Sequence, residues 1–104
     1  MAELSRAELS DLIAEATIDA YNRDEQLMGF AVMMENDLKT PFKTTVLGVK
    51  VTVESVIQKD SRIVANCVRG SHRQAISIED LPLPEPPPQG AKWIAAYAEW
   101  VKFA

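Results

Sequence analysis

The chain has 104 residues, of which 47% are hydrophobic, and a formal net charge of −4. This length predicts a single domain, 1–104, with a small hydrophobic core. The polar start does not resemble a signal peptide and no apolar run is long enough to cross a bilayer, so we expect a cytoplasmic protein that does not bind membranes. The lone Cys67 excludes an internal disulfide and a cysteine zinc cage.

The charge is unevenly distributed. Residues 1–37 contain nine acids and two bases, a net charge of −7, whereas residues 38–104 contain six acids and nine bases, a net charge of +3. This asymmetry is typical of a functional acidic surface, but a well-solvated helical face has the same composition. Nucleic acid is not an expected partner, because the strongest field is negative.

The first helix is predicted from its start signal. Ser5 and Glu8 form the S-x-x-E pattern of a capping box. Apolar residues then recur at helical spacing: Leu9, Leu12, Ile13, Ala16 and Ala20. Acids follow the same period beside them, and we expect this acidic stripe to be exposed and to produce only a diffuse field: Glu8, Asp11, Glu15 and Asp19.

A second helix is predicted after the segment YNRDE. Asp24 is its expected N-cap, with Glu25 in the first turn. Its inner face combines apolar positions at helical spacing: Leu27, Phe30, Ala31, Met34 and Leu38. Met28, Met33 and Met34 are interpreted as core filler. The helix should end between Met34 and Asp37, since Pro41 disfavours helical geometry at Thr40. The helical, acidic part is therefore 1–38.

Strand patterns dominate residues 42–81. The stretch VKVTVESVI alternates, which predicts one face formed by Val49, Val51, Val53 and Ile57. Gly70-Ser71 separates two further strand patterns and predicts a tight hairpin turn. Four short strands in this length favour a small antiparallel sheet that is either strongly bent or closed into an SH3-like barrel.

The C-terminal region contains a connector and a last helix. Residues 82–90, rich in proline, predict an extended, stiff connector. Residues 91–104 predict a helix with Trp93, Tyr97 and Trp100 along one side. We interpret these aromatic residues as packed against the core, with part of the stripe open to a dimer contact.

The sequence shows no catalytic constellation, so we do not expect an enzyme. His72, the sole histidine, falls in or beside a hairpin turn and is interpreted as solvated. Cys67 shares a strand face with Ile63 and Ala65, which indicates a small core residue. A Cys–His pair would require an exposed Cys67 close to His72. Phosphate-binding glycine loops and the EF-hand pattern are absent from the sequence.

The carboxylates at the end of the second helix present an electrostatic problem. Glu35 and Asp37 precede the negative end of the helix dipole, where acids are unfavourable. On an ideal helix the two side chains point about 200° apart, so one ion can bind both only if the helix frays at Asn36. A cation, Lys39 or Lys43 would each compensate the charge, and oxygen ligands suit calcium.

The stretch DEQLMGFAVMMENDLKTPFK resembles the motif of small bacterial calcium-binding proteins of the CcbP type. The matching positions are an acidic pair, a Met-Gly-aromatic run, an acid-rich helix end and a Pro-Phe pair: Asp24, Glu25, Met28, Gly29, Phe30, Glu35, Asp37, Leu38, Pro41 and Phe42. The likeness continues through AISIEDLPLPEP and YAEWV, and covers roughly residues 15–101. It implies calcium binding without an EF-hand, with candidate ligands Asp24, Glu25, Glu35, Asp37, Glu79 and Asp80.

Together these patterns predict an α+β protein with two N-terminal helices, an antiparallel β part at 42–81 and a C-terminal helix. The expected function is calcium binding through surface carboxylates, in buffering or sensing, without catalysis. The alternative is a metal-free interaction module that binds a protein partner or forms a homodimer. That module would use the acidic helix face or the aromatic C-terminal helix.

Overall fold

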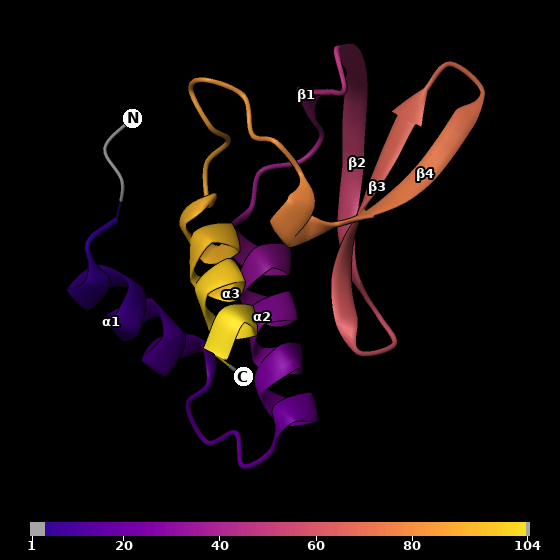
Figure 1. Cartoon of the computed structure of the whole chain (residues 1–104). Helices are drawn as coiled ribbons and strands as arrows, with labels where there is room; N and C mark the ends of the chain where they lie inside the picture. Colours follow the sequence, from indigo (N-terminus) through magenta and orange to yellow (C-terminus); the bar gives the residue numbers. More distant parts are fainter. Residues whose placement is uncertain (1–3, 104) are drawn as a thin grey trace.

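The computed structural model describes residues 4–103 and has the expected α+β architecture (Figure 1). The three helices pack together beside the lower half of the sheet in this view. The elements in chain order are α1 (Arg6–Ala16), α2 (Arg23–Asp37), β1 (Phe42–Val46), β2 (Val49–Lys59), β3 (Arg62–Arg69), β4 (His72–Ser77), the short 3₁₀-helix η1 (Ile78–Asp80) and α3 (Lys92–Phe103).

The sheet is open and antiparallel, with strand order β1-β2-β3-β4. The Gly70-Ser71 turn is confirmed, because Arg69 pairs with His72 across it. Of the two predicted sheet forms the bent one is realised, and the closed barrel is not. β4 ends at Ser77 and gives way to η1, so no strand continues from β4 to pair with the free edge of β1.

A β-bulge changes which side chains of β2 face inward. The pairing with β3 shifts in register between Val53 and Ser55. A bulge adds one residue to a strand and reverses the alternation beyond it. Val56 therefore packs against the core, while Ile57 is 45% exposed. The prediction that Ile57 shares the face of Val53 was wrong for this reason.

Helix α1 is shorter than its apolar spacing predicted. The capping box is confirmed: Ser5 and Glu8 exchange hydrogen bonds, which hold the pKa of the Glu8 carboxyl below its usual range. The helix ends at Ala16, so Ala20 and Asp19 lie beyond it. Asp19 has a φ of 58°, which is not right-handed helix. The acidic stripe is exposed as expected, but it does not extend along a helix as far as Asp19.

Helix α2 begins and ends close to the predicted positions. Its N-cap is Asn22, not Asp24, and Asp24 lies in the first turn. The inner face is confirmed, since Leu27, Phe30 and Met34 are buried and Leu38 caps the helix. The predicted end between Met34 and Asp37 is also confirmed, because the last helical residue is Asp37. Met28 was expected in the core but is 56% exposed.

The core joins α2, α3 and the sheet through aromatic residues. Phe30 meets Tyr97 edge to face, with ring centroids 5.7 Å apart, and approaches Trp100 at 5.3 Å. The Tyr97 hydroxyl accepts a hydrogen bond from the backbone of Ile63 in β3, at 3.2 Å. The predicted packing of the aromatic side of α3 is confirmed. Trp93, Tyr97 and Trp100 are all buried within this chain, so they do not form an exposed contact surface.

Gly29 explains part of the Met-Gly-aromatic run as a requirement of the fold. A Cβ atom at this position would lie 1.9 Å from the backbone oxygen of Ala16, the last residue of α1. Only glycine therefore allows the two helices to approach this closely. The following Phe30 enters the core, so Gly29 and Phe30 both serve the packing of α2.

Candidate functional site

The six candidate ligands lie at three places in the fold. Asp24 and Glu25 occupy the first turn of α2, Glu35 and Asp37 its last turn, and the third pair, Glu79 and Asp80, occupies η1. Between residues 4 and 103, no three Asp, Glu, His or Cys side chains gather closely enough to hold a metal ion. The structure therefore presents three separate acidic pairs rather than one shared set.

The two ends of α2 cannot share an ion. Asp24 and Glu35 are eleven residues apart on one continuous helix, which corresponds to roughly 16 Å along its axis at ~1.5 Å per residue. Calcium–oxygen distances are only about 2.3–2.6 Å. Any ion bound at one end of this helix must therefore find its remaining ligands locally.

Acidic charge at the N-terminal end of α2 is already compensated. The Asn22 side chain accepts a hydrogen bond from the Glu25 amide at 2.9 Å, and the Glu25 carboxylate accepts one from the Tyr21 amide at 3.4 Å. Carboxylates in the first turn also meet the positive end of the helix dipole. Asp24 and Glu25 thus stabilise the helix, and a cation beside them would be repelled by the same dipole.

The C-terminal end of α2 is held by residues distant in sequence. The Asp37 carboxylate accepts a hydrogen bond from the Trp93 indole nitrogen at 2.8 Å, and Trp93 itself is only 2% exposed. The Lys39 amide donates to the carbonyl of Gln89 at 2.9 Å instead of continuing the helical ladder. The segment before α3 therefore closes the helix end and fixes one oxygen of Asp37.

Helix α2 remains regular through Asn36, so the fraying that a shared ion would require does not occur there. The chain leaves the helix at Leu38, where φ and ψ are −76° and 122°. Just beyond the helix, the connector receives the chain at Lys39. Glu35 and Asp37 are both helical and point to different sides of α2, so this conformation does not bring their carboxylates together.

Several oxygen atoms at this helix end lack partners. The last carbonyls of α2, those of Glu35, Asn36 and Asp37, accept no backbone hydrogen bond in the described part of the chain. Neither Lys39 nor Lys43 forms a salt bridge with an acid there. The indole N–H of Trp93 is thus the group that partly offsets the negative charge of Asp37. Glu35 is exposed to solvent. Unpaired carbonyl and carboxylate oxygens are donors of the type that calcium prefers.

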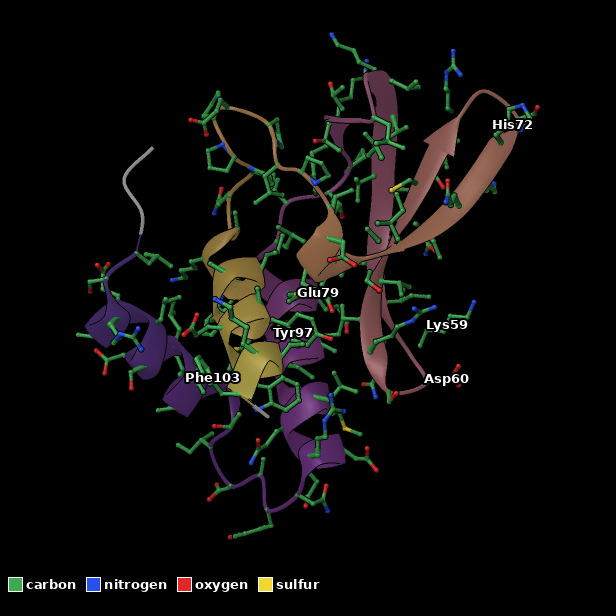
Figure 2. All side chains as sticks on the ribbon, in the orientation of Figure 1. Lys59, Asp60, His72, Glu79, Tyr97 and Phe103 are labelled. Carbon is green, nitrogen blue, oxygen red and sulfur yellow. The ribbon has the colours of Figure 1, made fainter. Side chains whose placement is uncertain are left out.

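The pair on η1 has a different environment. One carboxylate oxygen of Glu79, Oε1, is buried and has no hydrogen-bond partner among the residues that the structure describes. Figure 2 places Glu79 beside Tyr97 on the inner side of the sheet. Burial raises the pKa of Tyr97, and the charge of Glu79 raises it further. Asp80 is exposed, so the two neighbouring carboxylates face different surroundings.

Cys67 and His72 do not form a reactive pair. The Cys67 thiol is 4% exposed, its contact is the Ala65 carbonyl at 3.7 Å, and burial raises its pKa. His72 is exposed at the far tip of the β3–β4 hairpin (Figure 2). Burial keeps the thiol protonated and therefore unreactive.

Sequence reasoning missed the contribution of Trp93. Its position in an aromatic stripe predicted packing, and its indole N–H lies 56 residues from the carboxylate that it contacts. A buried tryptophan usually finds an acceptor for its N–H group. That general rule signals that an acceptor exists, but only the packing of α3 against α2 identifies Asp37.

None of the helices between residues 4 and 103 has the length and apolar character needed to span a bilayer. Comparison with curated proteins gives no match, and comparison with solved structures gives none either. A family model described as calcium binding, CcbP, matches residues 11–101 and so includes all six candidate ligands. The chain therefore belongs to the CcbP family of calcium-binding proteins.

Proposed function

We propose that this chain binds calcium through surface carboxylates, as a non-catalytic buffer or sensor without an EF-hand. The family description supports calcium as the ion. The donor set supports it as well, because the acidic pairs and the free helix carbonyls offer only hard oxygen ligands. Lone cysteine and lone histidine residues make a soft-metal site an inferior explanation.

The C-terminal end of α2 is the proposed centre. The observation that carries this choice is the Asp37 carboxylate, which a buried indole N–H fixes at the negative end of a helix dipole. Its second oxygen and the free carbonyls of Glu35 and Asn36 supply hard donors, and water would complete the coordination. Glu35, on a different side of the helix, contributes charge to the same end. A cation here relieves electrostatic repulsion that neither Lys39 nor Lys43 relieves by a salt bridge within residues 4–103.

The pair on η1 is the proposed second centre. An acceptor atom that is buried without a partner is unfavourable, and Glu79 Oε1 is such an atom within residues 4–103. Calcium ligation would satisfy it, and the exposed Asp80, which faces different surroundings, would add negative charge nearby. Asp24 and Glu25 remain candidates, but their helix-dipole environment already stabilises their charge without a cation.

We expect weak affinity, because calcium affinity follows the number of charged ligands and the rigidity of the site. One or two carboxylates per centre correspond to dissociation constants on the order of 10⁻⁴–10⁻³ M. Calcium at a hundred times the dissociation constant would then stabilise the folded protein by about 2.7 kcal/mol.

The test compares the two ends of the same helix by calorimetric titration of chelator-treated protein. The double substitution Glu35→Gln and Asp37→Asn should weaken calcium binding at least about tenfold, since amides lack the anionic oxygens that calcium needs. The matched control, Asp24→Asn with Glu25→Gln, removes the same charge from the same helix and should change affinity less than about threefold.

Thermal unfolding provides a second measurement. Calcium should raise the melting temperature of the native protein by mass action, and the double variant at residues 35 and 37 should lose most of that rise. An unchanged melting temperature at calcium concentrations well above the expected dissociation constant would reject calcium binding altogether. The metal-free interaction module on the exposed acidic face of α1 would then become the leading function. Equal losses in the two double variants would reject only the choice of helix end.

A further inference from the structure

The inner face of the sheet extends beyond the helices that cover its other half. The β1–β2 and β3–β4 turns lie at the end of the sheet away from the helices (Figure 1). Cross-strand pairs place side chains from all four strands on this face, for example Val46 opposite Val49 and Cys67 opposite Gln74. Because the barrel is not closed, this part of the face remains a concave pocket of about 490 Å³.

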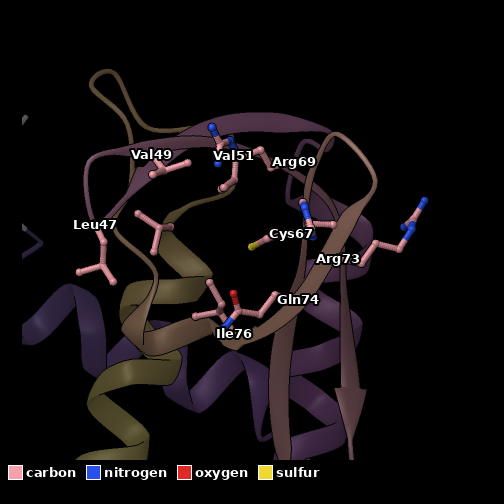
Figure 3. Close-up of a pocket in the computed structure, with 10 residues that line it drawn as sticks. Leu47, Val49, Val51, Cys67, Arg69, Arg73, Gln74 and Ile76 are labelled. Atoms are coloured by element: carbon pink, nitrogen blue, oxygen red, sulfur yellow. The ribbon is translucent and has the colours of Figure 1, made fainter.

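The pocket has an apolar floor (Figure 3). Val49, Val51 and Ile76 line it, with Cys67 between them. The cysteine is a buried, neutral thiol and behaves here as a small apolar side chain. A volume of this size lies within the range of about 300–1,000 Å³ that is typical of small-molecule sites.

Leu47, at the rim of this pocket, is a residue that the stability of the fold does not favour. Leu47 and Gly48 form the two-residue β1–β2 turn with φ values of 50° and 78°, the pattern of a type I′ turn. Such a turn strongly prefers Asn-Gly, because both positions need positive φ. The leucine is also 97% exposed. A residue that is unfavourable both in backbone conformation and in exposure, at a pocket rim, is the kind of local conflict that is found at functional sites.

The charge around the pocket is one-sided. None of the ten residues that line it is acidic, although the whole chain has a net charge of −4. Arg69 lies above the Cys67 floor on the side of Val51 (Figure 3). Between residues 4 and 103 it forms no salt bridge, whereas Arg73 is bound to Glu54 at 2.6 Å. Arg69 therefore presents an uncompensated cation beside an apolar cavity.

We propose that this pocket binds a small amphiphilic carboxylate. The hydrocarbon part would contact Val49, Val51 and Ile76, the carboxylate would meet the Arg69 guanidinium, and Leu47 would lose its exposure by covering the ligand. The guanidinium fork matches a carboxylate in geometry as well as in charge. This site is separate from α2 and η1, so it goes beyond calcium binding and does not depend on it.

Heteronuclear NMR titration in the presence of chelator tests the proposal with sodium octanoate as the probe, kept below its micelle concentration. Saturable shifts should appear in residues 46–51 and 67–76 and not in α1. Octylammonium, with the same tail and opposite charge, and acetate, with the same head group and no tail, should bind at least about tenfold more weakly. Equal binding of either compound, or no saturable shift with octanoate, would overturn the proposal.

Two variants separate a binding role from a structural one. Arg69→Gln should weaken octanoate binding about tenfold or more, as expected for loss of a charge-assisted hydrogen bond. Lys59→Gln removes one charge from the opposite end of the sheet and should leave binding unchanged. Leu47→Asn should raise the melting temperature, since asparagine suits this turn, while weakening octanoate binding roughly threefold to tenfold. Leu47→Asn binding as tightly as the native protein would refute the role of Leu47.

Discussion

The two ends of α2 both carry acidic pairs, yet they are built in different ways. The N-terminal end is local, since Asn22 caps the amide of Glu25 only three residues away. The C-terminal end depends on distant residues: Trp93 donates to Asp37, and Gln89 accepts from Lys39. One end could form in an isolated peptide, whereas the other exists only in the folded chain.

This difference explains why acids at the two ends of α2 differ in how strongly they favour a bound cation. At the N-terminal end the helix dipole stabilises carboxylates, so charge and structure agree. At the C-terminal end the fold holds Asp37 against the dipole, and the three last carbonyls stay without backbone partners in the described residues. The Asp37 carboxylate is repelled by the negative end of the helix dipole, and a bound cation would relieve this repulsion. A calcium site is therefore favoured where the fold, not the local sequence, positions the acid.

The largest expected effect comes from the connector that closes the C-terminal end. At Gly90, φ is 87° and a Cβ atom would lie 2.3 Å from the backbone oxygen of Asp37. Gly90→Ala should lower the free energy of unfolding by roughly 2–4 kcal/mol through backbone strain and overpacking. Gly48→Ala is the control, because φ is 78° there but nothing lies within 4 Å. If chemical denaturation showed the same loss of unfolding free energy in both variants, the connector would not pack tightly against α2.

The next effect isolates the indole that holds Asp37. Trp93→Phe should cost about 1–2 kcal/mol of unfolding free energy and weaken calcium binding several-fold, because the carboxylate loses its positioning donor. Trp100→Phe is a matched control, since its indole N–H donates at 2.8 Å to the neutral side chain of Gln26. Calorimetry should find calcium affinity unchanged in the control. A similar loss in both variants would mean that Trp93 acts only through packing.

The smallest effect concerns the local N-terminal end. Asn22→Ala should cost about 1 kcal/mol, the usual value of an N-cap, and leave calcium affinity unchanged. Asn36→Ala, at an exposed position of the same helix, should be neutral or slightly stabilising, because alanine favours helix. Denaturant unfolding and calcium titration of both variants measure this. If Asn22→Ala weakened calcium binding as much as Trp93→Phe, the site would belong at the N-terminal end.

Local patterns predicted the elements well and their details less well. The capping box of α1, the inner face of α2 and the Gly70-Ser71 turn are all confirmed, because each depends on residues close in sequence. The inward position of Ile57 was wrong, because a bulge depends on the partner strand. Asp24 was predicted as the N-cap, yet Asn22 takes that position two residues earlier. Asn and Asp are about equally favourable as N-caps, so N-cap propensity alone does not choose between these two positions.

For the candidate site, the sequence supplied the identity of the acids and the resemblance supplied the ion. Neither the sequence nor the resemblance showed which of these acids lie close together in the fold. The six carboxylates occupy three places, and no three metal-binding side chains of residues 4–103 converge. A shared ion at Glu35 and Asp37 required the helix to fray at Asn36, but the helix continues to Asp37 before Lys39 bonds to the connector at Gln89. The pocket beside Leu47 was not predicted either, since it arises from a sheet that bends without closing.

The sequence by itself determined the class of this protein: the order of helices and strands, the buried faces and the family motif. These follow from periodicity, capping and turn chemistry, which act over a few residues. Only the tertiary structure decided which acid is held against a helix dipole and which indole holds it. It also decided that the inner face of the sheet stays partly open. Contacts such as that between Trp93 and Asp37 join residues 56 positions apart, and no local preference encodes such a pairing.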